Sequence, residues 1–165
     1  MVNRLIKHLL IMPWQIRKVF TAAVCTTIEQ AIIESELHHR GEVRFVVEGS
    51  LDMPLLLRSV TARQRAITLF GHLGVWDTQE NTGVLVYVLF AEKRLEIVAD
   101  RGIAARVNQS EWNSISAEMS QAFCTGQFQN GAVAGLQRIT ALLAAHFPLD
   151  RDGNPDELPN RVIVL

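Results

Sequence analysis

The chain has 165 residues, of which 48 % are apolar and 20 % are charged, and its formal net charge is −1. This length fits one domain, and this composition excludes a disordered chain and a fibrous repeat. With a net charge so close to zero, the chain also lacks the excess of basic residues that is typical of general nucleic-acid-binding proteins, so we expect no nucleic acid as a partner.

The cysteines and the hydropathy pattern indicate a cytoplasmic protein. Cys25 and Cys124 lie far apart in apolar, helix-like segments, which is typical of free buried thiols in a reducing compartment. The apolar stretch between Lys7 and Pro13 is shorter than the core of a signal peptide and far shorter than a membrane span. Any membrane contact is therefore expected to be peripheral, at the inner membrane.

Residues 1–20 read as a basic amphipathic helix. Leucines and isoleucines between Leu5 and Leu10 form one apolar stripe, and no acid precedes Glu29. Such a helix can lie on an anionic membrane surface. The alternative is that it packs on the domain's own surface and leaves its basic side chains in water. The predicted surface for a membrane or a protein partner consists of Arg4, Lys7, Trp14, Arg17 and Lys18.

The next segments alternate between helix and strand periodicity. Apolar residues at helical spacing predict a helix over residues 22–39, which Gly41 ends. The β-rich run 43–48 predicts a strand, and a turn at 49–52 leads into a helix that begins at Pro54 or Thr61 and ends at Leu73. Residues 74–82 are expected to form a loop.

The second half of the chain predicts a hairpin and two long helices. Residues 83–90 are apolar on both faces, which is typical of a central strand covered by helices, and residues 94–100 form the return strand. Asn108 and Glu111 resemble a capping box at the start of a helix. A last helix is expected over residues 129–146, followed by a polar tail with an apolar end.

This order of elements predicts an α/β fold, a single-domain α/β/α sandwich around a small mixed β-sheet. The helical crossover between the first two strands makes them parallel, whereas the short connection at residues 91–93 makes the next pair antiparallel. We expect an N-terminal helix at residues 1–20, the domain at residues 21–148 and a C-terminal tail at residues 149–165.

No catalytic residue is predicted, because the usual phosphate-binding loops, nucleophile elbows and zinc-binding helices are absent. The strongest constellation is acidic. The hairpin register brings Asp100 to the sheet end where Asp77 and Glu80 enter, and such an oxygen-rich site suits calcium. Arg101 is adjacent and can contact a phosphate or a carboxylate. The alternative is a set of solvated loop acids with Arg101 paired to one of them.

Two other acidic segments are expected to lie outside this site. Glu48 ends the first strand and so falls at the opposite end of the sheet. The tail 150–157 superficially resembles a calcium loop, but its glycine and glutamate positions do not fit that motif, so we expect a polar loop there.

The order and spacing of several short motifs resemble the TPM domain family, which includes a thylakoid-lumen phosphatase-like protein. The segment Val75-Trp-Asp-Thr, the run from Thr82 to Val88 and the Asp100-Arg-Gly-Ile exit resemble the central part of that domain. Gly41-Glu-Val-Arg resembles its first strand, and Phe123, Gly126, Phe128 and Gly131 match a family pattern. The resemblance covers roughly residues 22–147 and is closest to a short bacterial branch.

The resemblance implies an α/β/α sandwich, calcium binding by acidic loops in some members and phosphatase activity in the plant branch. The first hypothesis is therefore a non-enzymatic interaction domain that binds calcium through Asp77, Glu80 and Asp100 and associates with a membrane or envelope partner. The second is a metal-dependent phosphatase that uses the same acids. The third is an adaptor that needs neither metal nor phosphate.

Overall fold

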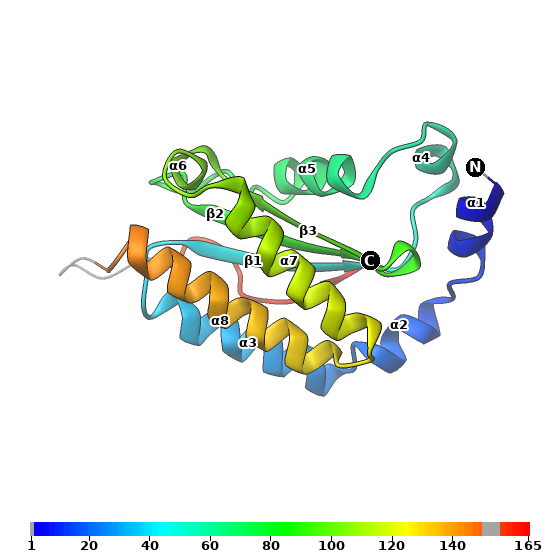
Figure 1. The fold of residues 1–165 in the computed structure, drawn as a ribbon, viewed down its shortest axis with the longest axis horizontal. Helices are drawn as coiled ribbons and strands as arrows, with labels where there is room; N and C mark the ends of the chain where they lie inside the picture. Colours follow the sequence, from blue (N-terminus) through cyan, green and yellow to red (C-terminus); the bar gives the residue numbers. More distant parts are fainter. Residues whose placement is uncertain (1, 150–155) are drawn as a thin grey trace.

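A four-stranded mixed sheet organises the protein. The computed structural model describes residues 2–149 and 156–165 (Figure 1). The strands are β1 (Glu42–Glu48), β2 (Gly83–Leu89), β3 (Arg94–Ala99) and β4 (Ile163–Val164), in the spatial order β3-β2-β1-β4. β1 pairs parallel with β2 and β4, whereas β2 pairs antiparallel with β3, so the predicted mixed sheet is confirmed.

The two central strands are buried along their whole length, as the sequence predicts for strands covered on both faces. The helices on one face are α3 (Ala22–Glu36), α7 (Gln109–Cys124) and α8 (Phe128–His146), and the other face carries α4 (Met53–Leu57) and α5 (Ala62–His72) (Figure 1). The predicted α/β/α sandwich is therefore confirmed.

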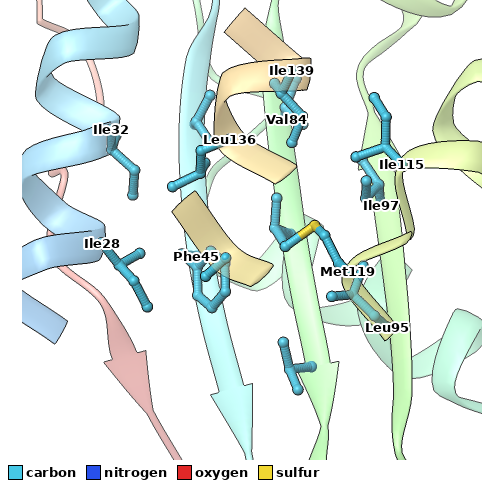
Figure 2. Packing of buried hydrophobic residues seen from close by; sticks show 14 of the residues in the cluster. Ile28, Ile32, Phe45, Val84, Leu95, Ile97, Ile115, Met119, Leu136 and Ile139 are labelled. Atoms are coloured by element: carbon cyan, nitrogen blue, oxygen red, sulfur yellow. The ribbon is translucent and has the colours of Figure 1, made fainter. Parts of the chain in front are cut away.

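The larger core lies under the three long helices. Figure 2 shows Phe45 and Val84 of the sheet beneath side chains from α3, α7 and α8, all of them buried: Ile28, Ile32, Ile115, Met119, Leu136 and Ile139. Each such side chain contributes about 1.5–3 kcal/mol when it leaves water. Alternating residues on the two faces of each strand thus hold helices on both sides of the sheet.

The N-terminal segment forms two helices and not the one helix expected over residues 1–20. α1 (Val2–Leu9) and α2 (Pro13–Val19) are separated by a short linker, and Pro13 opens α2. Proline lacks a backbone N–H and clashes with the preceding turn, so it suits the first turn of a helix and cannot continue one. No helix of the described residues combines the length and hydropathy needed to cross a bilayer.

Other differences from prediction are local. Of the two predicted starts of the helix ending at Leu73, Thr61 is confirmed as the N-cap of α5, whereas α4 is a separate helix because Ser59 takes a left-handed φ of 55° between the two. Asn108 begins α7 without a side-chain cap, so the capping box predicted there is absent. A short helix, α6 (Arg101–Ala104), and a 3-10 turn, η1 (Phe90–Glu92), were not predicted.

The C-terminal tail runs along the outer edge of β1. β4 pairs with β1 through Val46 and Val47, and the Gly49 amide donates to the Leu165 carbonyl. Leu158 is buried among the side chains under α4 and α5. The predicted apolar end of the tail therefore packs on the domain, whereas most of the polar loop expected at residues 150–157 lies outside the described residues, which omit 150–155.

Candidate functional site

The predicted acidic end of the sheet forms where β2 begins and β3 ends. Asp100 donates its backbone N–H to the Gly83 carbonyl, one residue away from the predicted position opposite Val84. The loop preceding β2 packs directly on α6, since a Cβ on Gly102 would collide with the Glu80 and Asn81 carbonyls. Sequence reasoning therefore placed the loop and Asp100 at the same end correctly.

The three predicted ligands do not converge there. Asp77 is exposed, Glu80 Oε1 accepts from Arg40 Nη1 at 2.6 Å, and Asp100 Oδ1 accepts from the Arg101 amide at 2.7 Å to cap α6. Arg101 Nε donates to Asn81 Oδ1 at 2.9 Å. Their carboxylates do not form a compact donor group among the described residues.

A different set of acids gathers at this same end. Within residues 2–149 and 156–165, the one group of three acidic, histidine or cysteine side chains whose donor atoms all lie within 4.8 Å of one another is Glu36, Glu42 and Asp156. Glu36 lies in the last turn of α3, Glu42 opens β1 and Asp156 lies on the tail. We refer to these three residues as the acidic cluster.

Backbone hydrogen bonds hold the acidic cluster in place. Glu36 Oε1 accepts from the Val43 amide at 3.0 Å, and Glu42 Oε2 accepts from the Leu158 amide at 3.1 Å. Glu42 is completely buried, whereas Asp156 is exposed. The cluster therefore opens to solvent on the side of the tail.

The acidic cluster holds carboxyl groups of like charge close together in a partly buried site. Burial, together with the nearby Glu42 and Asp156 charges, raises the pKa of Glu36 to about 8, so this carboxyl is mostly protonated at neutral pH. The guanidinium of Arg44, 7 % exposed, is close enough to interact with Glu36, and its Nε and Nη1 have no hydrogen-bond partner. Asn160 also interacts with Glu36, and its Oδ1 is buried without a partner.

Sequence reasoning missed the acidic cluster because its members come from three distant segments. Glu36 and Glu42 flank the Gly41 turn, which places two carboxylates near the same strand start, and this spacing was a usable signal. The contribution of Asp156 depends on the path of the tail, which no local pattern predicts. The calcium-loop-like residues 150–155 lie outside the described residues.

A buried serine–histidine pair in the core lacks the geometry of a nucleophile and its base. His39 Nδ1 accepts from the Gly41 amide at 3.1 Å, so Nε2 carries the proton and donates to Ser35 Oγ at 2.8 Å. Ser35 in turn donates to Thr140 Oγ1, because that hydroxyl donates to the Leu136 carbonyl. Every proton is engaged, and His39 has no free nitrogen to take one from Ser35.

The opposite end of the sheet carries the N-terminal helices. Arg4 Nε and His8 Nε2 both contact Glu92 Oε1 on η1, at 2.6 and 2.9 Å, and the Leu51 amide donates to His8 Nδ1 at 3.0 Å. Arg4 therefore faces the domain instead of forming part of a free basic surface. Lys7, Arg17 and Lys18 are exposed, as predicted.

Several large apolar side chains of the N-terminal segment face solvent. Leu9, Leu10 and Trp14 are 61 %, 65 % and 62 % exposed, and Ile6 and Met12 are exposed as well. We call these five residues the apolar face. Leu5, Ile11 and Ile16 of the same segment pack against the core, so the segment is docked on the domain as well, and both its basic residues and the apolar face are exposed.

Glu48, at the same end of the sheet, belongs to a closed network. Its carboxylate accepts two-pronged hydrogen bonds from Arg65 and one from the Tyr87 hydroxyl at 2.6 Å. Burial and the Glu48 contact raise the pKa of Tyr87. Arg65 and Tyr87 occupy this carboxylate, which supports a structural role for Glu48.

The comparisons with known proteins agree with this fold. The TPM domain profile matches residues 16–142, and no curated protein matches the chain. The NMR structure of BA42 from the psychrophilic bacterium Bizionia argentinensis has 30% identity and a TM-score of 0.77, over 88% of this chain and 94% of that one. The N-terminal domain of a P. gingivalis protein shares the fold at 15% identity and a TM-score of 0.63, over 77% and 78% of the two chains. The chain belongs to the TPM domain family.

Proposed function

We propose that this protein is a non-enzymatic TPM domain that docks on an anionic membrane surface through α1 and α2, on the cytoplasmic side. The observation that carries the proposal is the outward apolar face beside unpaired cations. Arg4 and His8 hold α1 against η1, and Ile6 and Leu9 of the same helix remain exposed to solvent. Large exposed apolar patches of this kind mark interaction surfaces.

The charge of the segment favours a membrane over a neutral protein surface. Lys7, Arg17 and Lys18 are exposed beside the apolar face, and the first acid in the chain is Glu29. Apolar burial at the headgroup boundary and attraction to anionic lipids add to each other in interfacial helices. Each basic residue near such a surface contributes about 1 kcal/mol.

Vesicle binding tests the membrane proposal. The full chain is sedimented with phosphatidylcholine vesicles with and without phosphatidylglycerol, and we expect binding to the anionic vesicles that weakens with salt. The triple variant Leu9→Ser, Leu10→Ser, Trp14→Ser should lower the partition coefficient more than about tenfold, since three apolar side chains no longer enter the interface. Neutralising Lys7, Arg17 and Lys18 to glutamine should remove the preference for anionic lipid.

A matched control removes apolar surface elsewhere. Ile67 and Trp76 are 52 % and 55 % exposed on α5 and the following loop, so Ile67→Ser with Trp76→Ser should leave vesicle binding unchanged. Unchanged binding of the Leu9, Leu10 and Trp14 variant would contradict the proposal. Failure of the wild-type chain to bind either kind of vesicle would overturn it and leave a protein as the partner of the apolar face.

We further propose that the acidic cluster binds calcium. Three carboxylates of different segments, with the amide oxygen of Asn160 beside them, supply the hard oxygen donors that calcium prefers. With Glu36 protonated, two carboxylates and Arg44 leave one net negative charge. A divalent cation that displaces the Glu36 proton brings the same group to neutrality, which supports binding of one ion.

A calcium titration of the metal-stripped protein, followed by amide NMR, separates the acidic cluster from the originally predicted acids. Saturable shifts at residues 36–43 and 156–160 are expected, and Asp156→Asn should weaken them about tenfold or more. Asp77→Asn is the matched control and should change nothing. Shifts that saturate at residues 77–83 and 100–103, and are lost in Asp77→Asn, would instead assign the ion to Asp77, Glu80 and Asp100.

The pH dependence follows from Glu36. Because its pKa is about 8, calcium must displace a proton below that pH, and the affinity should rise as the pH increases toward 8 and level off above it. The alternative function, a metal-dependent phosphatase, predicts metal-stimulated hydrolysis of a phosphate monoester that Asp100→Ala abolishes. That result would contradict the non-enzymatic part of the proposal.

A further inference from the structure

An apolar cavity lies at the hairpin end of the sheet and is used by none of the proposals above. Its volume is about 140 Å³, and its walls come from the β2–β3 hairpin, α7, the start of α8 and the linker between α1 and α2. Three aromatic rings in contact form part of the lining: Phe90 stacks on Phe128 with ring centroids 5.9 Å apart, and the Phe123 centroid lies 5.2 Å from that of Phe128. Such a wall suits a flat or short apolar group.

Two cations stand at the solvent side of this cavity. Lys93 and Arg94 line it and are exposed, and neither side chain forms a hydrogen bond or an ion pair within the described part of the chain. The neighbouring acid, Glu92, is engaged by Arg4 and His8 and so does not neutralise them. Lys93 takes a left-handed φ of 51° and ends η1, and Arg94 then opens β3. Both cations therefore lie at the hairpin tip.

We propose that this cavity binds an amphipathic carboxylate, whose apolar group of six to eight carbon atoms, roughly the size of a benzene ring with a short linker, packs against the cluster of phenylalanines. The carboxylate is held by Arg94 and Lys93, because charge-assisted hydrogen bonds from a guanidinium to a carboxylate are among the strongest that proteins form. The ring walls give affinity for the apolar group, and the two cations select an anion over a neutral analogue.

The test uses 3-phenylpropionate and its uncharged analogue 3-phenylpropanamide, each titrated into the full-length chain and followed by amide NMR. Saturable shifts are expected at residues 88–95 and 120–128 with the acid, and the amide should bind about tenfold more weakly, a difference of about 1.4 kcal/mol. A peptide that ends in phenylalanine presents the same chemistry, and binding by that peptide but not by the free acid would assign the carboxylate to a peptide terminus.

Surface variants keep the test independent of folding. Lys93→Gln with Arg94→Gln should lower affinity for the acid to that of the amide and leave amide binding unchanged. The matched control is Arg58→Gln. Arg58 is an exposed cation that follows α4, on the face of the sheet opposite to α7 and α8, so this variant should bind like the wild type. Ser120→Leu places extra volume in the cavity wall and should abolish binding of both compounds, with the melting temperature showing that the fold is retained.

Three results would overturn the proposal. The first is the absence of saturable shifts at millimolar concentrations of the acid and of the peptide. The second is equal affinity for acid and amide, which would remove the role of the cations. The third is full retention of acid binding in the Lys93→Gln, Arg94→Gln variant.

Discussion

His39 shows how one buried side chain links the fold to pH. It is completely buried, and burial lowers its pKa to about 4. Its Nδ1 accepts the Gly41 amide, so the neutral ring holds the turn that leads from α3 into β1. Adding a proton to Nδ1 breaks that hydrogen bond and places a positive charge in a buried site beside His38, which repels it.

Acidification should therefore destabilise the protein through His39. Its pKa falls from 6.5 to about 4 on folding, so the unfolded chain binds more protons between these values. The stabilisation is fully present above pH 6.5 and is lost as the pH falls through 4, to a total of about 3 kcal/mol. Urea unfolding at a series of pH values measures it.

Two histidine variants isolate the effect of His39. His39→Gln should be less stable at neutral pH and should lack that part of the pH slope. His72→Gln, an exposed histidine on α5, should keep the wild-type slope. Equal slopes in the wild type and in His39→Gln would show that another group is responsible.

At the scale of elements, apolar patterns predicted the strands well, whereas the residues that begin and end helices predicted the helix boundaries less well. The run Val84–Leu89 is apolar at every position, and it is the fully buried central strand that such a run indicates. Helix ends were harder to predict, because Pro13 and Ser59 interrupt periodic apolar patterns that continue on both sides. The side of α1 that faces the domain was unpredictable from local sequence, since Glu92 is distant in the chain.

Glu92 should hold α1 against the domain. Its carboxylate accepts from Arg4 and contacts the buried His8, and these contacts lower its pKa against the opposing effect of burial. We expect Glu92→Gln to destabilise the docked α1 by about 1–3 kcal/mol, because Arg4 and His8 lose a charged acceptor. Hydrogen exchange should become faster at the amides of α1, and little should change in α7 or α8.

The control for Glu92 is another acid of the same hairpin. Glu96 lies on β3, and its nearest cation, Arg63, is 3.9 Å away. Glu96→Gln should leave hydrogen exchange in α1 unchanged, because Glu96 does not contact α1 and a partly exposed ion pair of this length contributes little. Equal protection of α1 in the wild type and in Glu92→Gln would show that apolar contacts alone hold the helix.

At the scale of the whole molecule, the sequence predicted a sheet end where acids gather, but the compact group of carboxylates at that end consists of acids other than the predicted ones. The hairpin register and the loop before β2 are local consequences of strand pattern, so Asp100 and Asn81 were placed correctly. Glu36, Glu42 and Asp156 meet only because the tail returns along the edge of β1. No short window of sequence contains both Glu42 and Asp156, so local patterns do not predict their contact.

The length of β1 separates the acidic cluster from the N-terminal helices. Glu42 starts this strand and the apolar face lies beyond its other end, so seven residues of extended chain, roughly 23 Å, stand between them. The screening length in physiological salt is about 8 Å. Because this separation exceeds the screening length, an ion held by the carboxylates contributes almost nothing to the potential at the lipid headgroups. Calcium binding at one end of the sheet and membrane binding at the other should therefore be independent.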